Sequence, residues 1–191
     1  MKKTKTKTSI RTQAGATLIE ILIAVVVMAA GLLGLAGLQM NSLQYQKTSS
    51  SRSEAAQAVY DIGERIRSNW VMTPAGAAAD RAANEGRYNF VRTYAAAKAE
   101  TPAVNLACST SVCNTQQIAN NDFAEWLRNI QQRLPGGAAS ITPVTVNPAP
   151  FSAFDVVVMW VEQGFTGTDA NCPGAVGAPV GVKCLVVRVS I

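Results

Sequence analysis

Two kinds of residue in this sequence have a type and spacing that could support chemistry. One is a set of four cysteines, and the other is a single carboxylate that lies inside an apolar segment. The carboxylate is Glu20, within QAGATLIEILIAVVVMAAGLLGLAGLQ, residues 13–39. The chain has no histidine, the commonest general base and a frequent metal ligand. It contains no P-loop, GxSxG turn or zinc-binding helix, and no pair of acids stands out. We therefore expect no enzymatic activity, no metal, no cofactor and no small-molecule substrate.

The cysteines form two pairs that are close in sequence, Cys108 with Cys113 and Cys172 with Cys184. An even number of cysteines in a region expected to face an oxidising compartment indicates disulfides. We favour bridges between near neighbours, although the sequence leaves three pairings open. Zinc binding is the weaker interpretation, because C-x4-C and C-x11-C match no usual zinc site and histidine is absent.

The segment after Glu20 predicts a membrane-spanning helix, since residues 21–38 are 18 residues without a charge. Isoleucine, leucine and valine between residues 16 and 38 favour insertion by about 4 to 7 kcal/mol in total. A carboxylate opposes insertion by up to ~3 kcal/mol at the bilayer centre and by less near an interface. Insertion is therefore expected despite Glu20.

The formal net charge of +5 belongs to the N-terminal leader rather than to the rest of the chain. Five of the 17 basic residues precede the apolar segment: Lys2, Lys3, Lys5, Lys7 and Arg11. The rest of the chain therefore has 12 basic and 12 acidic residues. Basic residues just before an apolar segment keep that end cytoplasmic, so the remainder is expected outside the cytoplasm. A neutral remainder also weakens a nucleic-acid interpretation.

The same helix is predicted to continue past the membrane segment through residues 39–73. No proline occurs between residues 16 and 73. A helix of ~55 residues would be about 80 Å long, too long for one small globule. Its second half carries an apolar stripe at helical spacing: Ala55, Val59, Ile62, Ile66 and Trp70. This stripe is expected to pack on the globular domain.

Residues 74–191 are predicted to form an extracytoplasmic α+β domain. Residues 80–121 show little periodicity and are expected to be mainly loop. A second helix is predicted at about 122–134, with Asp122 as N-cap and Glu125 completing a capping box. The apolar face of this helix comprises Phe123, Trp126, Leu127, Ile130 and Leu134. Strands are predicted from residue 141, over 154–161 and over 184–191, in an antiparallel sheet with one face covered by the long helix.

The motif GATLIE, followed by about twenty apolar residues behind a short basic leader, resembles the class III signal of type IV prepilins and type II secretion pseudopilins. More narrowly, IRSNW, DFAEWLRNIQQRLPGG and the closing strands resemble PilV-like minor pilins. The resemblance implies the type IV pilin fold, with a long N-terminal helix packed on an antiparallel sheet and stabilised by disulfides. The N-terminal motif covers roughly 25 residues and is specific; the downstream likeness is looser.

By position, the resemblance implies that prepilin peptidase removes residues 1–15 by cutting after Gly15. Ala16 would then be the N-terminus, where this family commonly has an N-methylated phenylalanine or methionine. Glu20 matches the fifth-position glutamate of the family. Residues 16–38 would form the transmembrane and filament-core helix. The implied partners are other minor pilins, the major pilin, the inner-membrane assembly platform and inner-membrane lipid.

The function implied is that of a minor pilin that primes or modifies type IV pilus assembly and supports adhesion or twitching motility. The location implied is the inner membrane, with the domain in the periplasm, and then the pilus. A minor pseudopilin of a type II secretion system is the nearest alternative. A secretory signal peptide fits less well, because its apolar core should span about 7 to 15 residues and end at an A-x-A-like site.

A membrane-anchored binding module, an adhesin or a DNA receptor, is a further alternative. Arginines and aromatic residues interleave in one segment, as in surfaces that stack nucleic-acid bases: Arg81, Arg87, Tyr88, Phe90, Arg92 and Tyr94. Such a segment more often packs its rings in the core and solvates its arginines. DNA is therefore not expected as a partner.

Overall fold

The computed structural model describes residues 15, 17–73, 77–104, 112–144 and 152–191. It contains the helices α1 (Leu18–Ser68), α2 (Ala77–Arg87), α3 (Tyr94–Ala99) and α4 (Thr115–Arg133) and a short 3-10 helix, η2 (Gly174–Val176). The strands are β1 (Ala138–Val144), β2 (Ala153–Val161) and β3 (Val182–Ser190). The described chain divides into two compact units, within residues 1–43 and 44–191.

The described residues of the first unit form the N-terminal part of α1. Every side chain described between residues 17 and 46 is exposed. Large apolar groups are included, such as Met28 and Leu33, which are 68% and 75% exposed. The helix α1 is long and apolar enough to cross a membrane.

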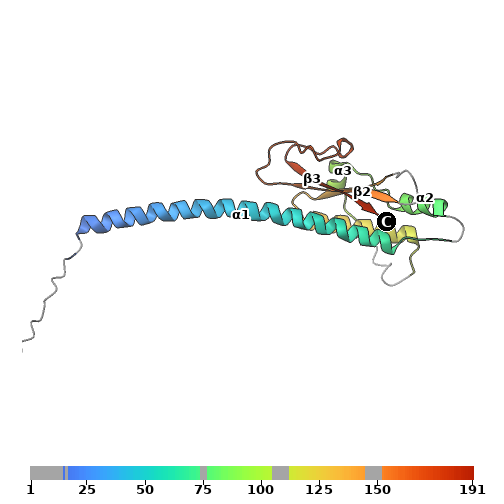
Figure 1. Cartoon of the computed structure of the whole chain (residues 1–191), viewed down its shortest axis with the longest axis horizontal. Coiled ribbons are helices and arrows are strands. Elements are labelled where there is room, and N and C mark those ends of the chain that lie inside the picture. Colours follow the sequence, from blue (N-terminus) through green and yellow to red (C-terminus); the bar gives the residue numbers. More distant parts are fainter. Residues whose placement is uncertain (1–14, 16, 74–76, 105–111, 145–151) are drawn as a thin grey trace, which may run out of the picture. The chain divides into compact units, whose positions relative to one another are not determined.

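The second unit is built on a three-stranded antiparallel sheet in the order β1-β2-β3. The C-terminal half of α1 runs along this sheet (Figure 1). The predicted stripe faces it, since Ala55, Val59, Ile62 and Ile66 are at most 4% exposed. Gly63 allows close packing here, because a Cβ atom at that position would lie 3.3 Å from a methyl group of Val189 on β3. The predicted fold class, α+β with a long N-terminal helix packed on an antiparallel sheet, is confirmed.

The helix α4 carries the apolar face predicted for it, and all five of its residues are buried in the same core. Its end also follows the prediction, since α4 stops at Arg133 and the chain turns at Pro135-Gly136-Gly137. Gly136 adopts a φ of 59°, where glycine is favoured. A Cβ atom at Gly137 would lie 2.4 Å from the carbonyl oxygen of Ile130. Glycine at both positions therefore allows the chain to pass directly from α4 into β1.

Three sequence-based predictions about this unit are wrong in part. The second helix begins at Thr115 rather than at Asp122, and residues 80–121 contain most of α2 and all of α3 rather than mainly loop. The long helix ends at Ser68, so residues 69–73 do not continue it. Short alanine-rich helices held by tertiary contacts give little periodic signal, which explains why α2 and α3 were not predicted.

The expectation that only one face of the sheet is covered is also wrong. Residues 156–160 of β2 point alternately to the two faces, yet all five are buried. On the second face, Met159 pairs with Cys184, and Cys184 is bonded to Cys172 in the β2–β3 loop. Val176 of that loop is buried in the core. The loop thus covers one end of the face opposite α1, while Arg188 near the other end is exposed.

Candidate functional site

The N-terminal residues predicted to act in processing and assembly lie at the start of α1. Gly15 is exposed, and Ala16 lies outside the described residues. Glu20 is in the first turn of α1, where its backbone N–H bonds to the carbonyl of Thr17 at 3.0 Å. The Glu20 side chain is exposed and makes no ion pair or hydrogen bond to any residue that the structure describes. Its carboxylate is therefore available to a group outside the described chain.

The segment around Glu20 gives that carboxylate an apolar surrounding. Residues 18–38 are helical, uncharged except for Glu20, and exposed along their whole length. Apolar surface of this extent is rarely left in contact with water in a soluble protein. A helix that is apolar on every side requires lipid or other protein around it. The geometry is thus that of a membrane or protein-packed helix with one acid near its N-terminal end.

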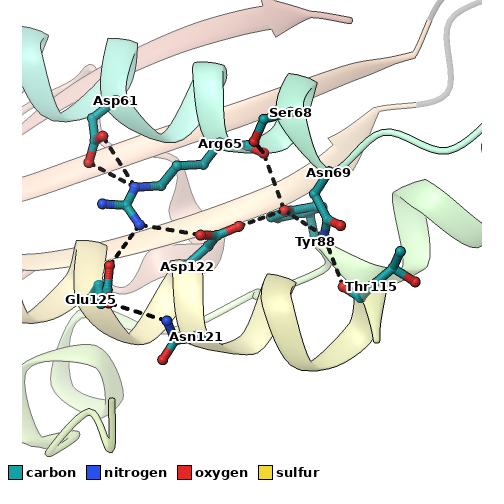
Figure 2. Close-up of polar contacts among 9 residues, drawn as sticks. All are labelled: Asp61, Arg65, Ser68, Asn69, Tyr88, Thr115, Asn121, Asp122 and Glu125. Carbon is teal, nitrogen blue, oxygen red and sulfur yellow. Dashed lines mark hydrogen bonds and ion pairs between the residues drawn. The ribbon is translucent and has the colours of Figure 1, made fainter. Parts of the chain in front are cut away.

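A second polar cluster, which we call the Arg65 network, joins α1 to α4 inside the globular unit (Figure 2). The Nε atom of Arg65 donates to both carboxylate oxygens of Asp61 at 3.2 Å. Its Nη1 atom donates to Asp122 at 3.2 Å and to Glu125 at 2.9 Å. The indole N–H of Trp126 adds a bond of 2.7 Å to the carbonyl of Ala58. These bonds fix α4 alongside α1.

Tyr88 extends the Arg65 network to the end of α1. Its hydroxyl donates to the second oxygen of Asp122 at 2.9 Å, and the ring is only 1% exposed. The Asn69 amide donates to the Tyr88 oxygen at 3.0 Å and to the carbonyl of Thr115 at 2.8 Å. Because each of these buried polar groups has a partner, the network can be retained in a packed core.

The network shifts the pKa values of its members in ways that follow from burial and pairing. Burial alone would lower the pKa of Arg65, but its bonds to Glu125, Asp61 and Asp122 raise that pKa above its ordinary value. Burial raises the pKa of Tyr88. Burial also raises the pKa of Asp122, although its bonds to Tyr88 and Arg65 oppose the shift. Desolvation is therefore the dominant effect on the pKa values of Tyr88 and Asp122.

The predicted roles of Asp122 and Glu125 in a capping box are wrong. Asn114 is the N-cap of α4, and it exchanges hydrogen bonds with Gln117 in a capping box. Asp122 and Glu125 lie within the helix and bind Arg65 instead. The spacing of Asp61 and Arg65, one helical turn apart, was a usable signal for this pair. No local pattern indicated that Tyr88 and Asn69 would join them.

The segment of interleaved arginines and aromatic residues does not present a stacking surface. Tyr88 and Tyr94 are buried, at 1% and 5% exposure. Phe90 stacks on Phe123, with ring centroids 4.2 Å apart and planes 8° from parallel. The rings belong to the core, while Arg92 pairs with Glu100 at 3.2 Å. These rings are thus not placed to stack on bases.

The structure confirms one of the two expected disulfides. Cys172 and Cys184 are bonded, and their Cα atoms are 5.1 Å apart. Cys113 is disulfide-bonded, whereas Cys108 lies outside the described residues. Among the described residues, no group of histidine, cysteine and acidic side chains is arranged to hold a metal ion.

No protein-family model, no curated protein and no solved structure matches this chain.

Proposed function

We propose that this chain is a minor pilin, a non-enzymatic subunit that primes or modifies the assembly of a type IV pilus. The observation that carries the proposal is the exposed apolar part of α1 with the unpaired Glu20 in its first turn. The basic leader, Gly15 and the α+β fold of the second unit agree with it. The resemblance of GATLIE to the class III signal supplies the family, since fold alone does not define function.

The proposed assembly mechanism follows from the electrostatics of one charged pair. Cleavage after Gly15 would create an ammonium group at Ala16, and that group and Glu20 are each costly in an apolar surrounding when unpaired. When helices stack side by side, Glu20 of one subunit approaches the ammonium group of the next. The pair lowers both costs and favours one axial stagger, because a shifted register leaves both charges without a partner.

A weaker effect accompanies the pairing within each subunit. Glu20 lies in the first turn of α1, where a negative charge interacts favourably with the helix dipole by about 0.3 to 1 kcal/mol. That interaction would be equally available to an acid on an exposed, water-soluble helix. It gives no reason for a carboxylate in apolar surroundings, whereas an intermolecular partner does.

The experiment compares the variants Glu20→Gln and Glu64→Gln in the native bacterium. Both changes remove one negative charge from α1 without changing side-chain size, and Glu64 is 72% exposed in the globular unit. We expect Glu20→Gln to be inserted and cleaved at normal levels but largely missing from sheared pili. Glu64→Gln should be incorporated like the parent. Immunoblots of the membrane and pilus fractions give the measurement.

Normal incorporation of Glu20→Gln would overturn the proposed electrostatic register. Processing is tested separately by intact mass, which should show the loss of residues 1–15 and no loss after replacement of Gly15. A type II pseudopilin would carry the same N-terminal segment, so a deletion strain should be scored for surface pili and for secreted enzymes. Loss of secretion with normal piliation would assign the chain to the secretion system instead.

A further inference from the structure

The two edges of the sheet differ in what covers them. At the outer edge of β1, Ile141 exchanges two backbone hydrogen bonds with Phe90, at 3.0 and 3.1 Å. Pro143 of the same strand has no backbone N–H to offer to a further strand. The other edge is β3, which pairs with β2 and with no further strand of the described chain. Only β1 is therefore closed to the addition of another strand by contacts that the structure describes.

The pairing with β2 determines which backbone groups of β3 face outward. In an antiparallel pair, alternate residues direct both their N–H and C=O groups to the partner strand, and the residues between them direct both away. At one end of β3, the N–H of Glu162 donates to the carbonyl of Gly181 at 3.1 Å. At the other end, the N–H of Ile191 donates to the carbonyl of Ser152 at 2.9 Å. Since the register between these bonds is continuous, odd-numbered residues bond to β2 and even-numbered residues face away from it.

Near both ends of β3, outward-facing groups are already bonded within the chain. The N–H of Cys184 donates to a carboxylate oxygen of Asp169 at 3.1 Å. The carbonyl of Ser190 accepts a hydrogen bond from the guanidinium of Arg67 at 3.0 Å. Both residues are even-numbered, as the alternation requires.

The centre of the β3 edge has no such partners. The N–H and C=O groups of Val186 and Arg188 face outward, and none of them bonds to a residue that the structure describes. Both residues are exposed. A charged side chain often protects an edge strand, but two bonds to Asp155, at 2.8 and 2.9 Å, hold the guanidinium of Arg188 on β2. Two donors and two acceptors are thus left open at the spacing of a β-ladder.

A groove with a volume of about 440 Å³ lies between β3 and α1. Its apolar wall includes Val59 and Tyr60 of α1 and Leu185 and Val187 of β3. Tyr60 is 76% exposed, while Leu185 and Val187 are on the face of β3 toward α1 and are only half-buried. Side chains of an added strand would point alternately to the two faces of the sheet. Every second one would therefore lie in this groove.

We propose that β3 binds an extended segment of another protein, which adds a further strand to the sheet and places apolar side chains in the groove. The open backbone groups define the form of the partner, because donors and acceptors at this spacing are matched by an extended backbone. The groove defines the pattern of the partner, because apolar side chains at alternate positions would cover Tyr60, Leu185 and Val187. This inference goes beyond the proposed pilin function and does not depend on it.

A second copy of this chain fits the edge less well. The strand β3 runs in the same direction as α1, since Arg52 lies near Lys183 and Arg67 binds Ser190. An antiparallel pair of β3 strands would therefore direct the two α1 helices oppositely, which is incompatible with a shared membrane anchor. A parallel pair would turn one sheet over relative to the other, and the Arg188 side chain of the second copy would then face the apolar groove.

The experiment measures hydrogen exchange of backbone amides by NMR in the 15N-labelled full chain in detergent micelles. In the free chain, the N–H groups of Val186 and Arg188 should exchange quickly, whereas those of Leu185 and Val187, which bond to β2, should exchange slowly. The probe is an acetylated seven-residue peptide in which valine alternates with threonine. At saturation it should slow the exchange of Val186 and Arg188 by about tenfold or more.

A matched peptide and two matched variants show whether backbone bonds carry the binding. The same peptide, N-methylated at the amides that face β3, keeps its side chains but cannot donate, and should bind about tenfold more weakly. Val186→Pro removes an outward donor at a position where an edge strand tolerates proline, and should weaken binding by a similar factor. Val186→Thr keeps this donor and changes a side chain on the face away from α1, so it should bind like the parent.

Three results would overturn the proposal. The first is slow exchange of Val186 and Arg188 in the free chain at every protein concentration, which would mean that the edge is already covered. The second is a probe peptide that gives no protection, or that binds no better than its N-methylated form. The third is protection that arises without peptide and increases with protein concentration, which would identify a second copy as the partner. If Val186→Pro fails to fold, the two peptides compared on the parent chain still decide.

Discussion

The two halves of α1 belong to one helix but differ in what surrounds them. Residues 21–38 are uncharged and exposed on every side. In the second half one apolar stripe is buried, and Ala55, Ile62 and Ile66 have no exposed surface. An amphipathic helix finds its cover within its own domain, whereas a helix that is apolar all round requires lipid or other subunits. The difference shows that one helix can serve two surroundings through side-chain pattern alone.

The charges of the two halves follow the same division. Arg65 in the second half reaches three acidic side chains of its own chain, at distances of 2.9 to 3.2 Å. Glu20 in the first half is exposed and has no such partner among the described residues. A charge placed in apolar surroundings is costly unless it is paired. The Arg65 pairs act within the folded domain, and in our proposal Glu20 acts between molecules.

The largest expected effect comes from shortening an apolar side chain in each half. Ile66→Ala should lower the free energy of unfolding by about 2 to 5 kcal/mol, because it leaves a cavity in the core. Leu33→Ala should change it by less than about 0.5 kcal/mol, because Leu33 is 75% exposed. Urea unfolding in detergent micelles, followed by tryptophan fluorescence, measures the difference, since all three tryptophans lie in the globular unit. Similar losses in both variants would contradict the comparison.

A smaller effect is expected from removing the charge that links α1 to α4. Arg65→Met keeps an apolar stem but leaves Asp122 and Glu125 without their cation. We expect a loss of about 1 to 3 kcal/mol, less than the 3 to 5 of a fully buried pair, because the Arg65 side chain is 25% exposed. The same urea unfolding experiment provides the measurement.

The matched control for this change is Arg133→Met. Arg133 pairs with Glu54 of α1 at 3.5 Å, but its side chain is 63% exposed. Exposed pairs of this kind contribute about 0 to 1 kcal/mol. If both variants lose the same stability, the Arg65 network has no special part in holding the domain half of α1.

Much of the fold could be predicted from the sequence because its signals are periodic. The 18 uncharged residues identify the first half of α1. The stripe from Ala55 to Ile66 and the alternation in β3 each identify an element and the face that it buries. The start of α4 was misplaced because Asp122 and Glu125 fit a capping box in sequence. Asn114 and Gln117, which form the real one, precede a stretch with a weaker apolar pattern.

The polar sites were harder to predict, because they join residues that are distant along the chain. The bond between Tyr88 and Asp122 spans 34 positions, and the ion pair of Arg65 with Glu125 spans 60. Long-range contacts of this kind leave no spacing in the sequence, whereas Glu20 was conspicuous because its surroundings are local.

The smallest expected effect is a pH dependence of the free energy of unfolding that arises in the globular unit. The pKa of Asp122 is raised by burial in the folded chain. At pH values between the unfolded pKa and the folded pKa, the folded chain therefore keeps a proton on Asp122 that the unfolded chain has released. The cost of burying this charge is therefore present above the folded pKa and is relieved as the pH falls toward the unfolded pKa. Relative to Asp122→Asn, the parent should gain stability as the pH falls through the raised pKa of folded Asp122 toward the ordinary carboxylate pKa of about 4. Each unit of pKa difference corresponds to about 1.4 kcal/mol.

Asp169 provides the opposite sign as an internal control. Its pKa is lowered, because its hydrogen bonds and Lys183 outweigh desolvation. Its contribution to stability is therefore present above the unfolded pKa and is lost as the pH falls through the folded pKa. Relative to Asp169→Asn, the parent should lose stability on acidification below the unfolded pKa, a range that lies just below the one in which it gains stability relative to Asp122→Asn. Urea unfolding at a series of pH values measures both differences, and two slopes of the same sign would mean that burial does not govern Asp122. Neither slope should change in a Leu33→Ala background, because Leu33 lies in the unit that is apolar and exposed.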